Sequence, residues 1–159
     1  MKHHPIESQI DAFLAKYSSE VSLQLRGART HLQAMFPRGH ELVYDNYNAL
    51  VFAFSPTERS SEAFLSVAGY PKWVNLFFSH GAGLSDPGRL LQGSGSRVRS
   101  IRLQSAEHLL EPAVQALISQ ATEPHREALL DAKPLQTSIK AIAAKQRSRR
   151  PAEKGENAA

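Results

Sequence analysis

The segment Trp73-Val74-Asn75-Leu76-Phe77-Phe78 decides the fold, because its side chains alternate with the period of a β-strand. One face, which we assign to the core, carries Val74, Leu76 and Phe78. The opposite face mixes aromatic and polar groups: Trp73, Asn75 and Phe77. This segment therefore predicts one strand of a sheet that has a buried face and a half-covered face.

Strand signals extend on both sides of this segment, over a region rich in valine, phenylalanine, tyrosine and leucine. We expect strands at residues 42–47, 49–55, 63–69, 73–79 and 98–103. Their connections are short, which favours antiparallel neighbours. We expect residues 81–95 to be irregular, with one short helical turn around residues 86–91.

Apolar residues recur at helical spacing before and after these strands. Residues 6–17 and 21–35 predict two N-terminal helices, with Ser18 or Ser19 as the cap of the second. Residues 105–121 predict a C-terminal helix. The predicted fold class is α+β: an antiparallel sheet of about five strands, with two N-terminal helices and one C-terminal helix packed on one face.

Charge divides the chain of 159 residues into two parts. Residues 1–131 hold 12 Lys and Arg against 13 Asp and Glu, whereas residues 132–159 hold 7 against 2. We predict a single domain over 1–131 and a basic, flexible tail over 132–159. Because the domain is nearly neutral, nucleic acid is not an expected partner of the core, although it is a candidate partner of the tail.

Composition also limits the location and the chemistry. The chain has no cysteine, which excludes disulfides, thiolate metal sites and a cysteine nucleophile. No segment approaches the roughly 18 apolar residues that a membrane span needs. The start of the chain leads into an amphipathic stretch and not into the continuous apolar run of a signal peptide. We therefore expect a cytoplasmic protein without a membrane partner. A Gly-x-Ser-x-Gly elbow is absent and no nucleophile–base set can be assembled, so we predict no catalytic residue.

Several segments together resemble the YdhG-like domain family, a family of unknown function: Glu41–Tyr44, Trp73–Phe78, Gly81–Pro87, Leu90–Arg97 and Arg99–Leu103. Some family members are described as frataxin-like intracellular iron chaperones. The resemblance covers about residues 6–121 and implies helices packed against an antiparallel sheet. The chain departs from the family at Tyr44–Tyr47, where members often have Tyr-Gly-x-Pro, and at Ser96-Arg97, where many have lysine.

The iron function that the resemblance implies would need clustered oxygen and nitrogen ligands. The first helix offers Glu7 and Asp11, one turn apart, and His3 and His4 lie near them in the sequence. A solvated helix surface explains these residues equally well. We keep iron as a candidate cofactor and these four residues as the candidate metal ligands.

The loop Gly93-Ser94-Gly95-Ser96-Arg97-Val98-Arg99 is the main candidate for ligand binding. Its glycines allow successive amides to form an anion nest, and its arginines suit phosphate or carboxylate. The alternative is a flexible connection whose arginines cap a helix end or bridge to Glu41 or Asp86. Trp73, Phe77 and His80 are candidates for the adjoining surface.

His80 and Asp86 flank two glycines and offer a second, weaker constellation. They are candidates for a His–carboxylate pair that transfers a proton or binds a metal. The competing interpretation is that Asp86 caps a short helical turn over residues 86–91.

Three functional hypotheses follow from these residues. The first is a non-enzymatic binding module for a small anionic ligand or a protein partner at the glycine loop, Gly93–Arg97. The second is a frataxin-like iron-binding chaperone. The third is an accessory nucleic-acid binder that acts through the basic run Lys145–Arg150 of the tail.

Overall fold

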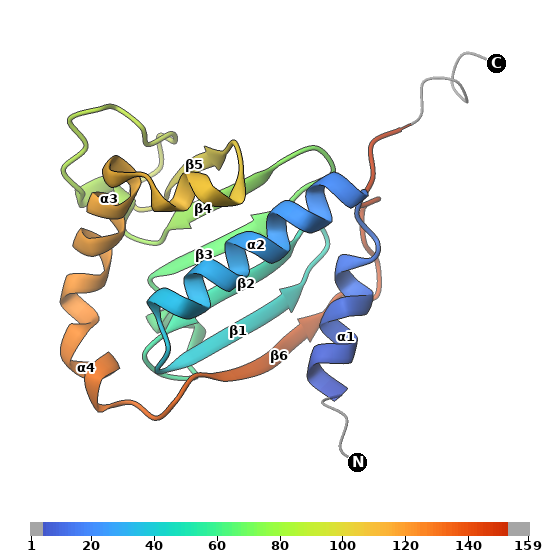
Figure 1. The fold of residues 1–159 in the computed structure, drawn as a ribbon, viewed down its shortest axis with the longest axis horizontal. Coiled ribbons are helices and arrows are strands. Elements are labelled where there is room, and N and C mark those ends of the chain that lie inside the picture. The colour runs from blue at the N-terminus through green and yellow to red at the C-terminus, as the bar shows by residue number, and fades with distance from the viewer. Residues whose placement is uncertain (1–4, 153–159) are drawn as a thin grey trace.

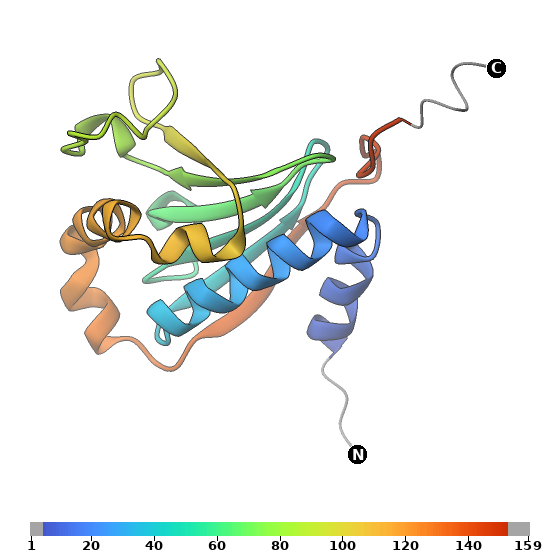
Figure 2. The ribbon, with the colours of Figure 1, turned by 45° about the horizontal axis from the view of Figure 1, so that its top comes forward.

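The structure, a computed structural model, describes residues 5–152, which form a twisted sheet with its helices on one face (Figures 1 and 2). The sheet has six strands in the order β5-β4-β3-β2-β1-β6. Their bounds are β1 (His40–Asp45), β2 (Leu50–Ser55), β3 (Leu65–Gly69), β4 (Val74–Phe78), β5 (Arg99–Leu103) and β6 (Gln136–Ile142). The first five pair antiparallel and lie within two residues of the predicted positions, and β6 pairs parallel with β1.

The four α-helices are α1 (Pro5–Leu14), α2 (Ser19–Met35), α3 (Pro112–Thr122) and α4 (Arg126–Asp131). Short 3-10 turns are η1 (Ser60–Glu62), η2 (Gly81–Gly83), η3 (Ala106–Leu110) and η4 (Glu123–His125). Ser18 caps α2, because its hydroxyl accepts a hydrogen bond from the Val21 amide at 3.3 Å. Over residues 5–152 no helix is both long and apolar enough to cross a membrane.

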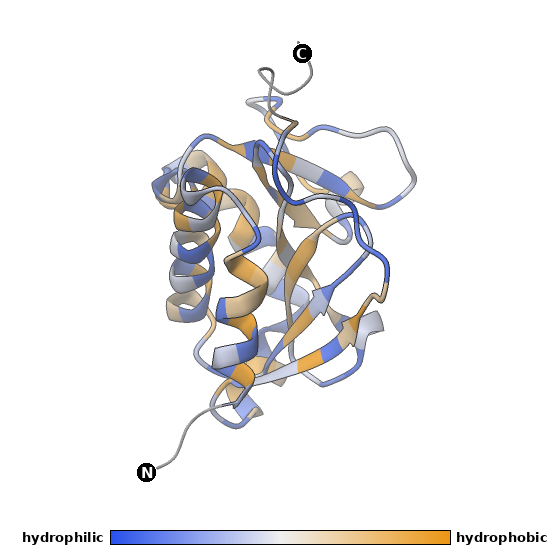
Figure 3. Cartoon of the chain, turned by 90° about the vertical axis from the view of Figure 1, so that its right-hand side faces the viewer, coloured by the Kyte–Doolittle hydropathy of each residue, from blue (hydrophilic) through white to orange (hydrophobic). Residues whose placement is uncertain are grey.

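The core lies between α2 and the sheet, as the alternation along β4 predicts. Val74, Leu76 and Phe78 are completely buried, and so are Leu25 and Leu32 of α2. Figure 3 shows hydrophobic residues along the helices and strands where the two layers meet. The α+β class and the buried face of β4 are therefore confirmed.

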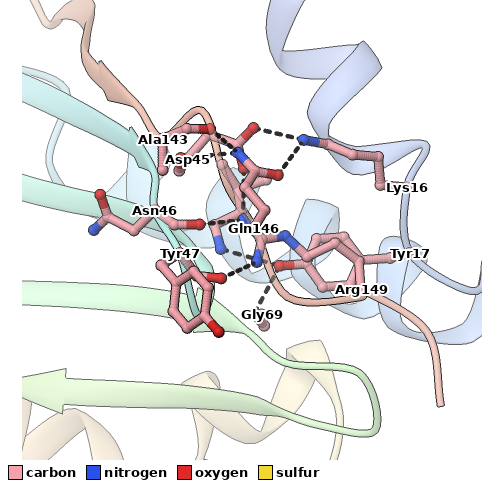
Figure 4. Close-up of polar contacts among 10 residues, drawn as sticks. Lys16, Tyr17, Asp45, Asn46, Tyr47, Gly69, Ala143, Gln146 and Arg149 are labelled. Atoms are coloured by element: carbon pink, nitrogen blue, oxygen red, sulfur yellow. Dashed lines mark hydrogen bonds and ion pairs between the residues drawn. The ribbon is translucent and has the colours of Figure 1, made fainter. Parts of the chain in front are cut away.

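The prediction of a flexible tail that begins at residue 132 is wrong for the described residues. The segment 136–142 is β6, which hydrogen-bonds along the whole of β1 and occupies an otherwise open sheet edge. Beyond β6, Arg149 is buried, and its Nη2 donates to Asp45 Oδ1 at 2.9 Å (Figure 4). The domain thus continues to at least residue 150, while the end of the predicted tail, 153–159, lies outside the described residues.

Candidate functional site

The glycine loop, Gly93–Arg97, is exposed and is closed by two hydrogen bonds between the backbones of Gln92 and Ser100, at 2.8 and 2.9 Å. Next to it, Arg99 turns its Nη1 inward, donating to the carbonyl oxygens of Gly95 at 2.6 Å and Val98 at 2.8 Å. The predicted anion donor Arg99 is therefore engaged by carbonyls of the loop itself.

Arg97 is also exposed, and its side chain makes no hydrogen bond or ion pair among residues 5–152. The alternative interpretation, an arginine of this loop bridging to Glu41 or Asp86, is wrong. Glu41 is paired with Arg29, and the Asp86 carboxylate accepts backbone amides. The loop places no second unpaired cation beside Arg97, because Arg99 donates to carbonyl oxygens of the loop.

An amide nest does exist just before this loop, and Asp86 fills it. The two carboxylate oxygens of Asp86 accept hydrogen bonds from the amides of Leu90 and Leu91, each at 2.9 Å. Asp86 thus caps backbone amides, but residues 86–91 form a turn and not the helical turn that we predicted. This turn holds Arg89 at φ 53°, the one positive φ of a non-glycine residue in the described range.

Three cations line a hollow of about 610 Å³ beside β5, the outermost strand at one end of the sheet. We call it the Arg102 hollow; it is lined by Glu20, Gln24, Lys72, Trp73, Arg89, Leu90, Gln92, Ile101, Arg102, Leu103, Gln104 and His108. Lys72, Arg89 and Arg102 are all exposed, and none forms a salt bridge or side-chain hydrogen bond within residues 5–152. Glu20 is the one carboxylate in the lining, so the hollow carries an excess of positive charge.

Strand register explains why Arg102 and Trp73 come together. Arg102 lies opposite Asn75 in the β4–β5 ladder, and it points outward because Ile101 and Leu103 point into the core. Trp73, two residues before Asn75, is its diagonal neighbour on the same face. The guanidinium carbon of Arg102 lies 3.8 Å from the centre of the Trp73 ring, a cation–π contact that fixes both groups.

Of the residues predicted for binding, Trp73 alone lines this hollow. His80 lines a separate pocket of about 780 Å³, where the His125 ring stacks on Phe64 at 4.9 Å. Burial, together with the nearby charge of His80, lowers the pKa of His125. Phe77 lies half-buried on the outer face and lines neither space, so the predicted residues do not converge on one cleft.

The sequence interpretation missed Lys72, Arg89 and Arg102. A signal was present for Arg102, since it is the charged residue between two apolar ones in a predicted strand. Lys72 directly precedes Trp73, so both residues lie in the turn between β3 and β4. Arg89 gave no signal, because it lies in an irregular loop whose path depends on the Asp86 hydrogen bonds.

Both carboxylates predicted as metal ligands are paired with arginines. Glu7 accepts two hydrogen bonds from Arg29, at 3.1 and 3.0 Å, and Asp11 accepts one from Arg26 at 3.0 Å. His3 and His4 lie outside the described residues. In the part that the structure describes, no group of three or more histidine or acidic side chains is arranged to hold a metal ion.

Gly93 and Gly95 make different structural demands, which yields a stability prediction. Gly93 has φ +125°, and a Cβ there would lie 3.2 Å from the Val98 carbonyl oxygen. We expect Gly93→Ala to cost about 1–3 kcal/mol of unfolding free energy. Gly95→Ala is the matched control, since a Cβ at Gly95 meets nothing within 4 Å and its φ is not positive. Urea unfolding of both variants checks this, and equal stabilities would contradict it.

Comparison with known proteins gives no match for this chain among protein-family models, curated proteins or solved structures.

Proposed function

We propose that the protein is a non-enzymatic binding module that takes a small anion, a phosphate or a carboxylate, in the Arg102 hollow. One observation carries the proposal: Lys72, Arg89 and Arg102 line one hollow, none of them forms a salt bridge within residues 5–152, and Glu20 is the one carboxylate beside them. Three exposed cations that face one hollow with a single carboxylate create a positive potential there, and arginine and lysine form strong charge-assisted hydrogen bonds with phosphate or carboxylate.

The geometry of Arg102 and Arg89 supports this choice of ligand. One face of the Arg102 guanidinium rests on Trp73, which leaves its edge, where the N–H groups lie, for planar recognition of an oxyanion. Arg89 is held in a left-handed conformation by the Asp86 turn, and such strain is often retained where a side chain must be aimed. No pair of groups in the hollow is arranged as nucleophile and base, so we propose binding and not catalysis.

The resemblance to the YdhG-like family and a cytoplasmic location remain predictions beside this proposal. The lack of cysteine is compatible with a reducing compartment. The carboxylates expected to bind iron are engaged by Arg29 and Arg26, so we do not extend the proposal to iron.

Calorimetric titration with inorganic phosphate and with succinate tests the proposed function. We expect binding at millimolar concentration or better, and a loss of roughly tenfold in affinity on Arg102→Ala, because one charge-assisted contact disappears. Arg97→Ala is the matched control, an exposed arginine of the glycine loop without a protein partner, and it should bind like the wild type. Absence of binding to the wild type would refute the proposal, and an equal loss with Arg97→Ala would place the site in the glycine loop.

A further inference from the structure

The C-terminal segment carries a second set of cations to the neighbourhood of the Arg102 hollow. Arg149 anchors this segment, because its Nη2 also donates to the carbonyl oxygen of Asn46 at 2.6 Å. The amide of Arg147 donates to the Tyr47 carbonyl oxygen at 2.8 Å. Figure 2 shows the segment (red) beside the turns that join β1 to β2 and β3 to β4.

Two further hollows continue the surface from Trp73 to this segment. The C-terminal hollow, of about 510 Å³, is lined by Pro71, Lys72, Trp73, Arg147, Ser148, Arg150, Pro151 and Ala152. It shares Lys72 and Trp73 with the Arg102 hollow. A smaller hollow of about 370 Å³, which includes Asn48 and Tyr70, shares Arg147 with it. The three hollows therefore form one continuous surface, on which Trp73 is the wall between the first and the second.

Four cations and the rings of Tyr70 and Trp73 line this surface. We call the cations Lys72, Arg89, Arg102 and Arg147 the basic strip. The Arg147 side chain is exposed, forms no hydrogen bond or ion pair within residues 5–152, and lies 5.7 Å from the Tyr47 ring. The Tyr70 and Trp73 rings lie 6.4 Å apart. Arg150 is excluded from the strip, because its guanidinium donates to the carbonyl oxygens of Lys16 and Ala15 at the end of α1.

We infer that the basic strip binds single-stranded nucleic acid, with phosphates on the four cations and a base against Trp73. The inference rests on the proposed function, since the Arg102 hollow is one end of the strip and would take one phosphate. A small anion fills one hollow only and leaves Arg147 unused. A polymer with regularly spaced negative charges engages both ends.

The aromatic rings decide between a nucleic acid and an acidic peptide. Interleaved cations and aromatic platforms suit unstacked bases, because each base offers a π-face and each linkage a charge. Arg102 already lies over the Trp73 ring, and an acidic peptide would use the cations but offer no ring to the part of Trp73 that lines the C-terminal hollow. A duplex hides its bases in the stack, so the wall formed by Trp73 between two hollows favours a single strand over a double helix.

The test is fluorescence anisotropy of the full chain with labelled oligothymidylate and oligouridylate of about twelve nucleotides, within the usual site sizes. Over a salt series, four phosphate contacts should give a slope of log affinity against log salt of about −3, at roughly 0.7 per contact. Arg147→Ala should reduce the slope by about 0.7 and leave phosphate binding and the melting temperature unchanged, because its side chain is exposed and unbonded. Trp73→Leu should weaken binding at least fivefold through lost stacking.

The controls separate this inference from the proposed function. Arg59→Ala removes an exposed charge from the β2–β3 connection, at the opposite end of the hairpin strands from Lys72, and should change nothing. If phosphate binds but the oligonucleotides do not, or if polyglutamate binds as tightly as they do, this inference fails and the proposed function stands. If neither phosphate nor the oligonucleotides bind, both fail. If Arg147→Ala changed neither the affinity for the oligonucleotides nor the salt slope, the inference that the basic strip binds nucleic acid would also fail.

Discussion

A chain that ends at Asp131 should lose at least about 3 kcal/mol of unfolding free energy, and we expect it to aggregate. It lacks β6, so the backbone of β1 becomes an open sheet edge. It also lacks Arg149, which leaves the completely buried Asp45 with Lys16 alone. Removing one partner of a buried ion pair typically costs about 3–5 kcal/mol. Urea unfolding followed by circular dichroism measures the loss.

A chain that ends at Ala152 is the matched control, since it keeps both β6 and Arg149. Arg149→Met removes the ion pair with Asp45 but keeps β6, so it tests the ion pair even if the shorter chain fails to fold. Burial alone would raise the pKa of Asp45, but hydrogen bonds from Lys16 and Arg149 lower it below its ordinary value of 3.8. The pair therefore stabilises the fold above pH 3.8, and the difference between wild type and Arg149→Met should shrink as the pH falls further. Equal stability of the two shortened chains would show that β6 contributes little.

Glu41→Ala should be the most damaging single substitution, at about 3–5 kcal/mol. Glu41 is completely buried on β1 and accepts hydrogen bonds from Arg29 Nε at 2.7 Å and Arg29 Nη2 at 3.0 Å. Gln33 and Thr137 donate to the same carboxylate, at 3.0 and 2.7 Å. Its removal leaves the buried guanidinium of Arg29 without its main counter-charge.

Glu7→Ala is a control on the same arginine. Glu7 also pairs with Arg29, but its side chain is half exposed, so its loss should cost no more than about 1 kcal/mol. The double variant Arg29→Met with Glu41→Leu should recover much of the stability, since it removes both charges and leaves an apolar pair over Phe52. Unfolding curves that gave equal losses for Glu7→Ala and Glu41→Ala would contradict the role of burial.

The strands could be predicted where their side chains alternate between a buried and an exposed face. Alternation along Val74–Phe78 and the short turns fixed five strands to within a few residues. The strand β6 was missed because it lies at an edge and buries few side chains. Its contribution is made by backbone hydrogen bonds to β1, which every residue type except proline can make. The β-branched Thr137 and Ile139, two residues apart, were the one signal available for it.

The two buried ion pairs could not be read from the sequence either. Glu41 and Asp45 look like solvated strand residues until the alternation of β1 turns them inward, where Arg29 and Arg149 meet them. Their partners lie 12 and 104 residues away in the chain. Only tertiary packing brings charges so far apart in sequence to one point, and the same holds for the Lys72, Arg89 and Arg102 side chains of the candidate site.

By itself the sequence determined the α+β class, the buried face of β4 and a serine cap for α2, because each depends on local periodicity or local chemistry. The tertiary structure alone decided that the basic C-terminal segment docks as β6 and its Arg149 anchor, and that free cations gather around Trp73. Both outcomes arise from strand register and from the pairing of buried charges, which are relations between distant residues that no local pattern encodes.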